Sequence, residues 1–178
     1  MNVASLRGLV DDFHTHRPMT PRAIINTAPG DQRPAGYLYS VGIHPWDSAS
    51  ASQSDFEALL IDARRPDVVA IGECGIDRLR GPQEALQRSV FIPQLEIAEM
   101  VGKPVIIHCV RATDAILALR RGMRHSVDWI LHGFRGKPET ACQLARAGIY
   151  ISLGERFNPE VLSSVDPSMI VYETDMQP

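Results

Sequence analysis

The chain has 178 residues, of which 44% are hydrophobic and 22% are charged, and its formal net charge is −3. This length and composition predict one soluble, globular domain over residues 1–178, large enough to bury a core. The slightly acidic balance argues against a protein that coats nucleic acid, because such proteins are usually basic. It leaves room for an enzyme that holds a phosphate through a metal ion, since the metal supplies positive charge.

The cysteines and the hydropathy pattern bear on the cellular compartment. Cys74, Cys109 and Cys142 are an odd number without C-x-x-C spacing. A disulfide framework or a cysteine zinc finger is therefore not expected, and a reducing cytoplasm is the predicted location. No apolar run approaches the roughly 18 residues of a membrane span, and the N-terminus lacks the apolar core of a signal peptide. We expect no membrane partner, and the sequence gives no indication of oligomeric state.

Short runs rich in Val, Ile and Leu recur along the chain and predict eight β-strands. Several are almost continuously apolar, which is typical of strands that are buried on both faces of a parallel sheet. The predicted strands are 8–14, 23–28, 37–44, 68–76, 104–109, 128–134, 149–154 and 169–174.

Helical patterns fill the gaps that follow the third strand. The first of them offers Ser54 as an N-cap with Glu57 three residues later, the spacing of a capping box. Pro93 is expected to kink the second helix, because proline cannot donate the helical hydrogen bond. The predicted helices are 54–65, 82–102, 112–122, 137–148 and 158–165.

Alternating strands and helices predict an α/β fold with a parallel sheet, and eight strands favour a (β/α)8 barrel over an open sheet. The first two connections, 15–22 and 29–36, offer about eight residues each, which at ~3.3 Å per residue can retrace a strand only as bare loop. We therefore expect a reduced TIM-type barrel in which the early helices are shortened or absent.

Five of the six histidines, and two carboxylates, lie at or near the carboxyl ends of predicted strands. In a parallel barrel these ends form the rim that carries the active site. Singly, each such residue is more often ordinary surface, so the prediction rests on their joint position. Imidazoles favour Zn²⁺, and carboxylates also accept Mg²⁺ or Mn²⁺, so the set suits two divalent metal ions. The predicted metal ligands are His14, His16, Glu73, His108, His132 and Asp175.

Several motifs together resemble the TatD family of metal-dependent hydrolases, which belongs to the amidohydrolase-like barrel superfamily. The resemblance covers residues 11–175, and the motifs occur in the order and approximate spacing of that family. They are DFHTH, GIHPWD, AIGECGID, QRSVFIPQLEIAEMVGKPVIIHC, ILHGFRG and YETD.

The resemblance implies individual roles for these residues. Glu73 would be the carboxylate that bridges both metals, and Asp175 a ligand that also orients or deprotonates the nucleophilic water. These two are the predicted catalytic residues. His44 would contact the substrate phosphate or a further ion. The implied reaction is hydrolysis of DNA or another phosphodiester by metal-activated water, as in a TatD-like deoxyribonuclease.

The chain departs from the family pattern in ways that affect substrate binding. The family often has an arginine two residues after the fifth-strand histidine, where this chain has Val110 followed by Arg111. Arg111 is therefore the predicted phosphate contact, and Arg78, just past the fourth strand, is a second. The chain stops at Pro178, where the family usually continues, so the C-terminal helices are expected to be shortened or absent.

Two other functions remain open at this level. The first is a metal-dependent amidohydrolase or esterase that acts on a small molecule, which the acidic net charge and short loops favour. The second is a truncated relative that binds metal or a partner without turnover.

Overall fold

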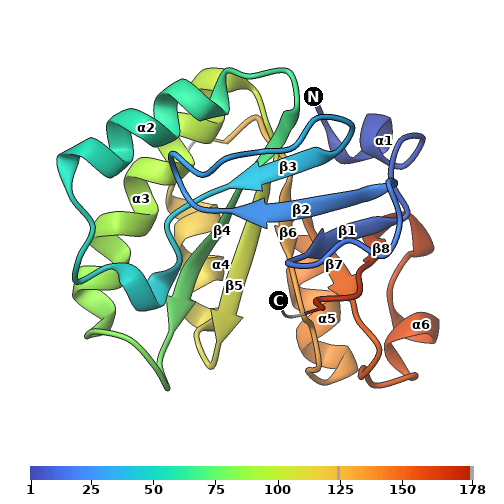
Figure 1. Cartoon of the computed structure of the whole chain (residues 1–178). Coiled ribbons are helices and arrows are strands. Elements are labelled where there is room, and N and C mark those ends of the chain that lie inside the picture. Colours follow the sequence, from blue (N-terminus) through green and yellow to red (C-terminus); the bar gives the residue numbers. More distant parts are fainter. Residues whose placement is uncertain (124, 177–178) are drawn as a thin grey trace.

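The computed structural model describes residues 1–123 and 125–176. Eight parallel strands lie side by side in chain order and form a nearly closed barrel, which confirms the predicted TIM-type fold (Figure 1). Each predicted strand is present, although most are shorter than the apolar run that predicted them. The strands are β1 (Asp12–Thr15), β2 (Ala23–Thr27), β3 (Leu38–Val41), β4 (Val68–Asp77), β5 (Val105–Val110), β6 (Trp129–Leu131), β7 (Ile149–Leu153) and β8 (Ile170–Tyr172).

Helices pack around the barrel from the third strand onward. Residues 16–22 and 28–37 contain no helix, as predicted from their length, so β1 and β2 lie at a wall without crossover helices (Figure 1). The last predicted helix is reduced to α6. The helices are α1 (Val3–Leu6), α2 (Gln53–Ala63), α3 (Glu84–Val101), α4 (Thr113–Gly122), α5 (Pro138–Arg146) and α6 (Val161–Ser164), with 3-10 turns η1 (Pro45–Asp47) and η2 (Pro167–Met169). None of these helices is both long and apolar enough to cross a bilayer.

One detail of the predicted helices differs from the structure. The N-cap of α2 is Ser52, and the carboxylate of Asp55 accepts its backbone N–H at 2.8 Å, so the predicted pairing of Ser54 with Glu57 is wrong. Asp55 forms this bond because it lies three residues after Ser52, which is the spacing of a capping box. The helix α3 includes Pro93 within its length and extends to Val101.

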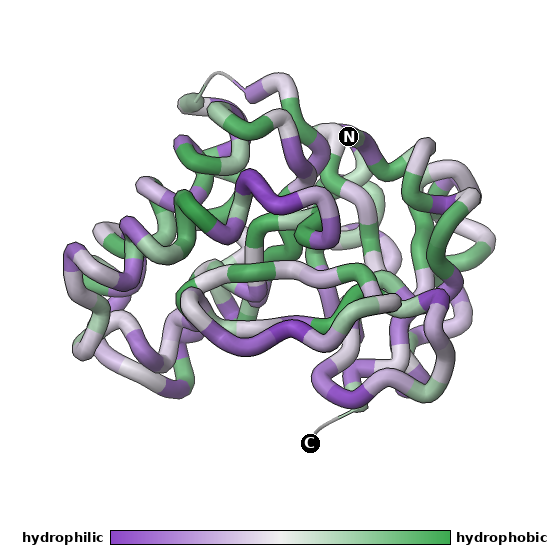
Figure 2. Tube along the Cα trace, turned by 45° about the horizontal axis from the view of Figure 1, so that its top comes forward, coloured by the Kyte–Doolittle hydropathy of each residue, from purple (hydrophilic) through white to green (hydrophobic). Residues whose placement is uncertain are grey.

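The strands carry apolar side chains on both faces. Along β5 and β6, Ile106 and Ile130 belong to an inner cluster with Val3 and Leu6 of α1. This helix lies at the amino-terminal end of the strands, where the backbone N–H of Val3 donates to Asp128, just before β6. Figure 2 shows the apolar stretches concentrated in the strands, with apolar and polar residues alternating along the helices. Because side chains alternate along a strand, the residues two positions after Ile106 and Ile130 also face the barrel interior, at its carboxyl rim.

Hydrogen bonds between β1 and the segment after β8 close the barrel. The backbone N–H of Asp175 donates to the carbonyl of His14 at 3.0 Å, and that of His16 donates to the carbonyl of Met176 at 3.0 Å. The buried carboxylate of Asp12 accepts from the backbone N–H of Thr174 at 3.0 Å and from its hydroxyl at 2.6 Å. The end of the described chain is thereby held beside the first strand.

Close packing of β4 against β5 predicts a large difference in stability between two Gly→Ala variants. Gly75 has a φ of +150°, and a Cβ there would overlap the backbone oxygen of His108. We expect Gly75→Ala to lower the free energy of unfolding in urea by about 2–3 kcal/mol, because the strand pair must shift. The exposed Gly122, at the end of α4, has nothing within 4 Å of the corresponding position. Gly122→Ala should be neutral or stabilising by about 0.5 kcal/mol, and equal stabilities of the two variants would contradict this packing.

Candidate metal centre

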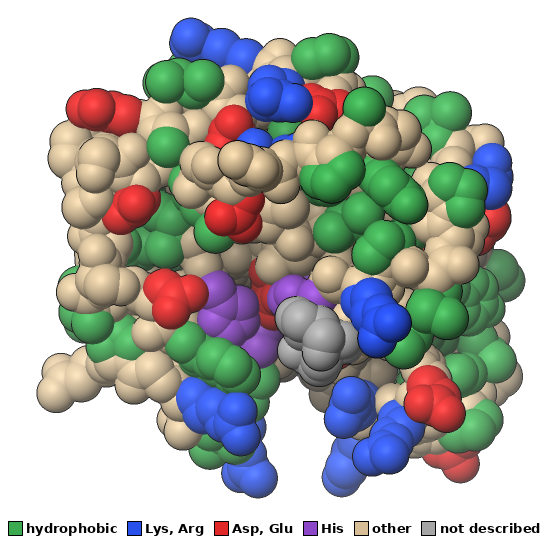
Figure 3. Space-filling model, viewed as in Figure 1, with side chains coloured by type: hydrophobic (Ala, Val, Ile, Leu, Met, Phe, Trp, Pro, Cys, Tyr) green, Lys and Arg blue, Asp and Glu red, His purple; other side chains and the backbone are tan. Residues whose placement is uncertain are grey.

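The six predicted metal ligands converge at the carboxyl rim of the barrel. Figure 3 shows histidine side chains at the base of a hollow on this face, flanked at its lower edge by Lys and Arg side chains. Neighbouring strands bring the ligands together although they are up to 161 positions apart in the sequence. His14 is in β1 and His16 follows it, Glu73 is in β4, His108 is in β5, His132 follows β6, and Asp175 follows β8.

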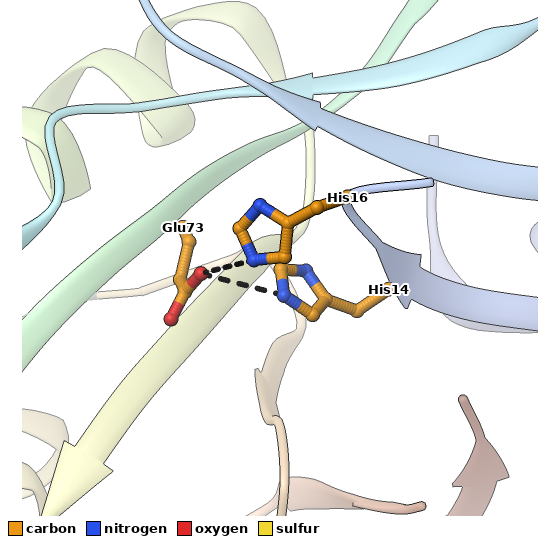
Figure 4. A group of neighbouring side chains, drawn as sticks. All are labelled: His14, His16 and Glu73. Atoms are coloured by element: carbon orange, nitrogen blue, oxygen red, sulfur yellow. Dashed lines mark ion pairs between the residues drawn. The ribbon is translucent and has the colours of Figure 1, made fainter. Parts of the chain in front are cut away.

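The Glu73 carboxylate lies between two pairs of histidines. Its Oε2 is 3.3 Å from Nε2 of His14 and 3.5 Å from Nε2 of His16 (Figure 4). Its Oε1 is 2.6 Å from Nδ1 of His108 and 2.8 Å from Nε2 of His132. The carboxylate therefore presents one oxygen to each pair, an arrangement that suits a ligand shared by two ions.

Asp175 lies on the side of the first histidine pair. Its Oδ1 is 3.7 Å from Nε2 of His14 and 3.9 Å from Nε2 of His16. The ligand atoms of His14, His132 and Asp175 all lie within 4.8 Å of one another, as do those of His14, His16 and Glu73. These separations let one ion contact atoms from three different strands.

The hydrogen bonding of His14 provides a test of whether a metal fits here. Its side chain is fully buried, and neither ring nitrogen has a hydrogen-bond partner among residues 1–123 and 125–176. Buried polar atoms are rarely left in this state, because the loss of hydration is costly. An imidazole nitrogen and a carboxylate oxygen that face each other without a hydrogen bond can both coordinate one cation, so the residues fit a divalent metal ion.

The electrostatics of the site favour a charged carboxylate. Burial by itself would raise the pKa of Glu73, but His132, His108 and His14 outweigh it and hold that pKa far below its usual range. Burial would likewise lower the pKa of His132, but Glu73 and Glu173 raise it well above the ordinary value. The negative charge of Glu73 is thus maintained by the imidazoles around it.

His44, the predicted phosphate contact, lies directly beside two of the predicted metal ligands. Its Nε2 is 3.2 Å from Oε1 of Glu73 and 3.4 Å from Nδ1 of His108. On its other side, Nδ1 accepts the backbone N–H of Trp46 at 3.3 Å, which fixes the ring at the start of η1. His44 is therefore oriented toward the pair formed by His108 and His132.

Three residues that the sequence analysis did not select hold the ligands in position. Asp77 accepts from Nε1 of Trp46 at 2.7 Å, and the same oxygen lies 3.1 Å from Nε2 of His108. Glu173 accepts the backbone N–H of Gly133 at 2.6 Å, beside His132, and Asn26 accepts that of Glu73 at 2.7 Å. Asp77 and Glu173 lie inside the motifs AIGECGID and YETD, so the sequence contained a signal that could have identified them. Asn26 lies in none of the motifs.

Two buried glutamines of α3 secure the loops around the site. Gln94 accepts the backbone N–H of Ile43 at 2.8 Å and donates to its carbonyl at 3.1 Å. Gln87, seven residues earlier and so on the same side of the helix, accepts the N–H of Asp77 at 2.7 Å and donates to its carbonyl at 2.8 Å. These contacts fix the residues next to His44 and the carboxylate that touches His108.

The two predicted substrate arginines differ in their surroundings. Arg78 forms ion pairs with Glu84 at 2.6 Å and with Asp114, and it donates to the carbonyl of Arg111 at 2.8 Å. Arg111 lines a groove that also contains the metal-ligand candidates His108 and His132. Of the two, Arg111 borders the site, while Arg78 is held in ion pairs beside it.

Two cavities meet at the metal centre. The first has a volume of about 560 Å³, within the range of small-molecule sites, and its wall includes Trp46, Asp47 and Asp55. We call it the acidic cavity. The second, which we call the basic groove, includes Arg111, Arg135 and Lys137. The residues common to both are His108, His132 and Asp175.

Comparison with known proteins gives a consistent match along the chain. Residues 21–178 match the family model described as TatD related DNase. A 3′-5′ ssDNA/RNA exonuclease TatD from Klebsiella pneumoniae (strain 342) is 34% identical over 153 residues, which are 79% of this chain and 57% of the relative. The protein of the same name from Citrobacter koseri is 38% identical over 126 residues, which are 68% of this chain and 48% of the relative. The chain thus spans about half the length of the curated relatives it matches.

Solved structures share the fold. The crystal structure of YjjV, a TatD homologue from Escherichia coli K12, matches with a TM-score of 0.79 at 22% identity, over 96% of this chain and 80% of that one. A TatD-family hydrolase from Entamoeba histolytica matches with a TM-score of 0.68 at 21% identity, over 78% of this chain and 50% of that one. At these identities the likeness supports the barrel architecture alone.

The contacts of Gln94 predict that an apolar replacement of similar size will destabilise the loop that carries His44. Gln94→Leu leaves the backbone N–H and carbonyl of Ile43 without their partners, which should lower the free energy of unfolding by about 2–3 kcal/mol. The KM for a phosphodiester substrate should rise as well, because His44, the predicted phosphate contact, loses its fixed backbone. The exposed Gln53 provides the matched Gln53→Leu control, expected to stay within about 0.5 kcal/mol of the parent. An unchanged Gln94→Leu protein would show that α3 does not hold this loop.

Proposed function

Because the chain belongs to the TatD-related DNase family, we propose that it is a metal-dependent phosphodiesterase that shortens single-stranded DNA, with the 3′-5′ direction and the tolerance for RNA named for its relatives. The observation that carries this proposal is the position of the Glu73 carboxylate, with one oxygen toward each of two histidine pairs. Paired metal sites of this kind are used for in-line displacement at phosphorus.

We infer that the cofactors are two divalent ions, Zn²⁺, Mg²⁺ or Mn²⁺. His14, His16 and Asp175 would hold one ion, His108 and His132 the other, and Glu73 would contact both. Ions bound in this way would polarise a phosphoryl oxygen and lower the pKa of a water molecule. The mixture of imidazole and carboxylate ligands is compatible with each of the three metals.

The side chains divide the remaining work. Asp175 accepts the proton of the attacking water, whose oxygen forms a new bond to phosphorus while one ester P–O bond breaks and the leaving oxygen takes up a proton. His44 donates a hydrogen bond to a non-bridging phosphate oxygen, and Arg111 pairs with phosphate from the side of the basic groove. Arg78 stays a candidate phosphate contact, with Glu84 and Asp114 already bound to it.

Replacing the shared carboxylate tests this proposal directly. Glu73→Gln preserves the size of the side chain and removes its charge, so Mn²⁺-dependent hydrolysis of a labelled single-stranded oligonucleotide should fall by at least about 100-fold. Calorimetry should show weaker metal binding in the same variant. The exposed Glu57 of α2 supplies the control, and Glu57→Gln should keep the parent rate. Equal activity of the two variants would rule out a shared carboxylate.

Salt dependence separates a nuclease from a hydrolase of small molecules. A strand that contacts several phosphate-binding groups releases counterions, so the affinity measured by fluorescence anisotropy should fall steeply as salt rises. An affinity that does not change with salt would favour the amidohydrolase or esterase. Metal binding without hydrolysis of any phosphodiester would favour the non-catalytic alternative.

A further inference from the structure

The acidic cavity and the basic groove carry opposite charges on either side of one reaction centre. Apart from the metal-ligand candidates, the charged side chains on the wall of the acidic cavity are Asp47 and Asp55, and no Lys or Arg is among its lining residues within 1–123 and 125–176. The basic groove instead contains Arg111, Arg135 and Lys137. A polyanion that reaches the centre is therefore attracted along one side only.

A positive charge that contacts the wall of the acidic cavity, that of Arg33, is already neutralised. The Nε of Arg33 donates to the hydroxyl of Thr27, a wall residue, at 3.0 Å. Its guanidinium is bound to Asp62 at 2.9 Å, and its side chain is only 1% exposed. Arg33 thus supports the wall without offering a cation to a ligand in the cavity.

An indole ring forms a firm part of the cavity wall. Trp46 is 43% exposed, and its Nε1 donates to the buried carboxylate of Asp77 at 2.7 Å. The guanidinium of Arg80 lies 5.0 Å from the ring centroid and is not part of the cavity wall. A partly exposed ring that is fixed at its edge by a hydrogen bond is suited to stack on a nucleobase, which is a sequence-tolerant contact.

We propose that the acidic cavity is the subsite for the 3′-terminal nucleoside, that Trp46 stacks on its base, and that Asp47 and Asp55 select a free 3′-hydroxyl against a 3′-phosphate. The rest of the strand lies in the basic groove. A hydroxyl can donate to a carboxylate, whereas a terminal phosphate is repelled by it. This inference rests on the proposed nuclease function and adds to it a defined chemical state of the strand end.

Two oligonucleotides that differ only at the 3′ end test the selection. With Mn²⁺, the strand ending in a 3′-phosphate should be shortened about tenfold or more slowly than the strand ending in a 3′-hydroxyl. The double variant Asp47→Asn/Asp55→Asn should reduce that ratio to about twofold, because both charges are gone. Glu57→Gln removes a charge from the same helix as Asp55 but outside the cavity wall, and should retain the full ratio. Equal rates for the two strands in the parent protein overturn the proposal.

A second substrate distinguishes this failure from failure of the proposed function. Bis(p-nitrophenyl) phosphate has no terminal nucleoside and reports phosphodiester hydrolysis alone. Its hydrolysis, together with equal rates on the two strands, would contradict only the selection of the 3′ end. Absence of hydrolysis on every substrate would contradict the nuclease function itself.

Measurements of nucleotide binding test the proposed subsite independently of catalysis. With Mg²⁺ present, deoxyadenosine 5′-monophosphate should quench tryptophan fluorescence and bind about tenfold more tightly than deoxyadenosine 3′,5′-bisphosphate. The Trp46→Phe variant should lose most of the quenching while keeping the preference, because Trp129 is buried in the core and the carboxylates remain. Equal affinity for the two nucleotides, or quenching that survives in Trp46→Phe, overturns the proposal.

Discussion

The structure depends on one buried negative charge surrounded by imidazoles. Glu73 is 3% exposed and has His14 and His16 on one side and His108 and His132 on the other. A carboxylate in such a position is tolerated only when positive charge and hydrogen bonds compensate for lost hydration. The barrel supplies this compensation, because parallel strands bring distant residues to one rim.

Closure of the barrel serves the same centre. The position of Asp175 is set by hydrogen bonds to β1: its own backbone N–H donates to the carbonyl of His14, and the N–H of the preceding Thr174 donates to the carboxylate of Asp12. The bonds that join the ends of the sheet therefore also set the distance between Asp175 and the first histidine pair. Around this frame, Gln87 and Gln94 of α3 hold the loops that carry His44 and Asp77.

The sequence was sufficient for the architecture and for the convergence of the ligands, because apolar runs mark buried strands and histidines at their ends mark the rim. It was not sufficient for contacts that form between elements. The sequence places Arg78 just past the fourth strand and so near the predicted site, yet in the structure Asp114 of α4 and Glu84 of α3 bind its side chain. Asn26 of β2 accepts the backbone N–H of Glu73, but it lies in no sequence motif that would have identified it. Ser52 is the N-cap in place of Ser54 because more than one serine near the start of this helix could serve as the cap.

The central claim is that the Glu73 carboxylate joins two metal sites. Crystals grown with Mn²⁺ and measured near the manganese absorption edge test it most directly. The account predicts two anomalous peaks, one between Glu73 and the pair His14 and His16, and one between Glu73 and the pair His108 and His132. A single peak, or peaks that do not contact Glu73, would contradict it.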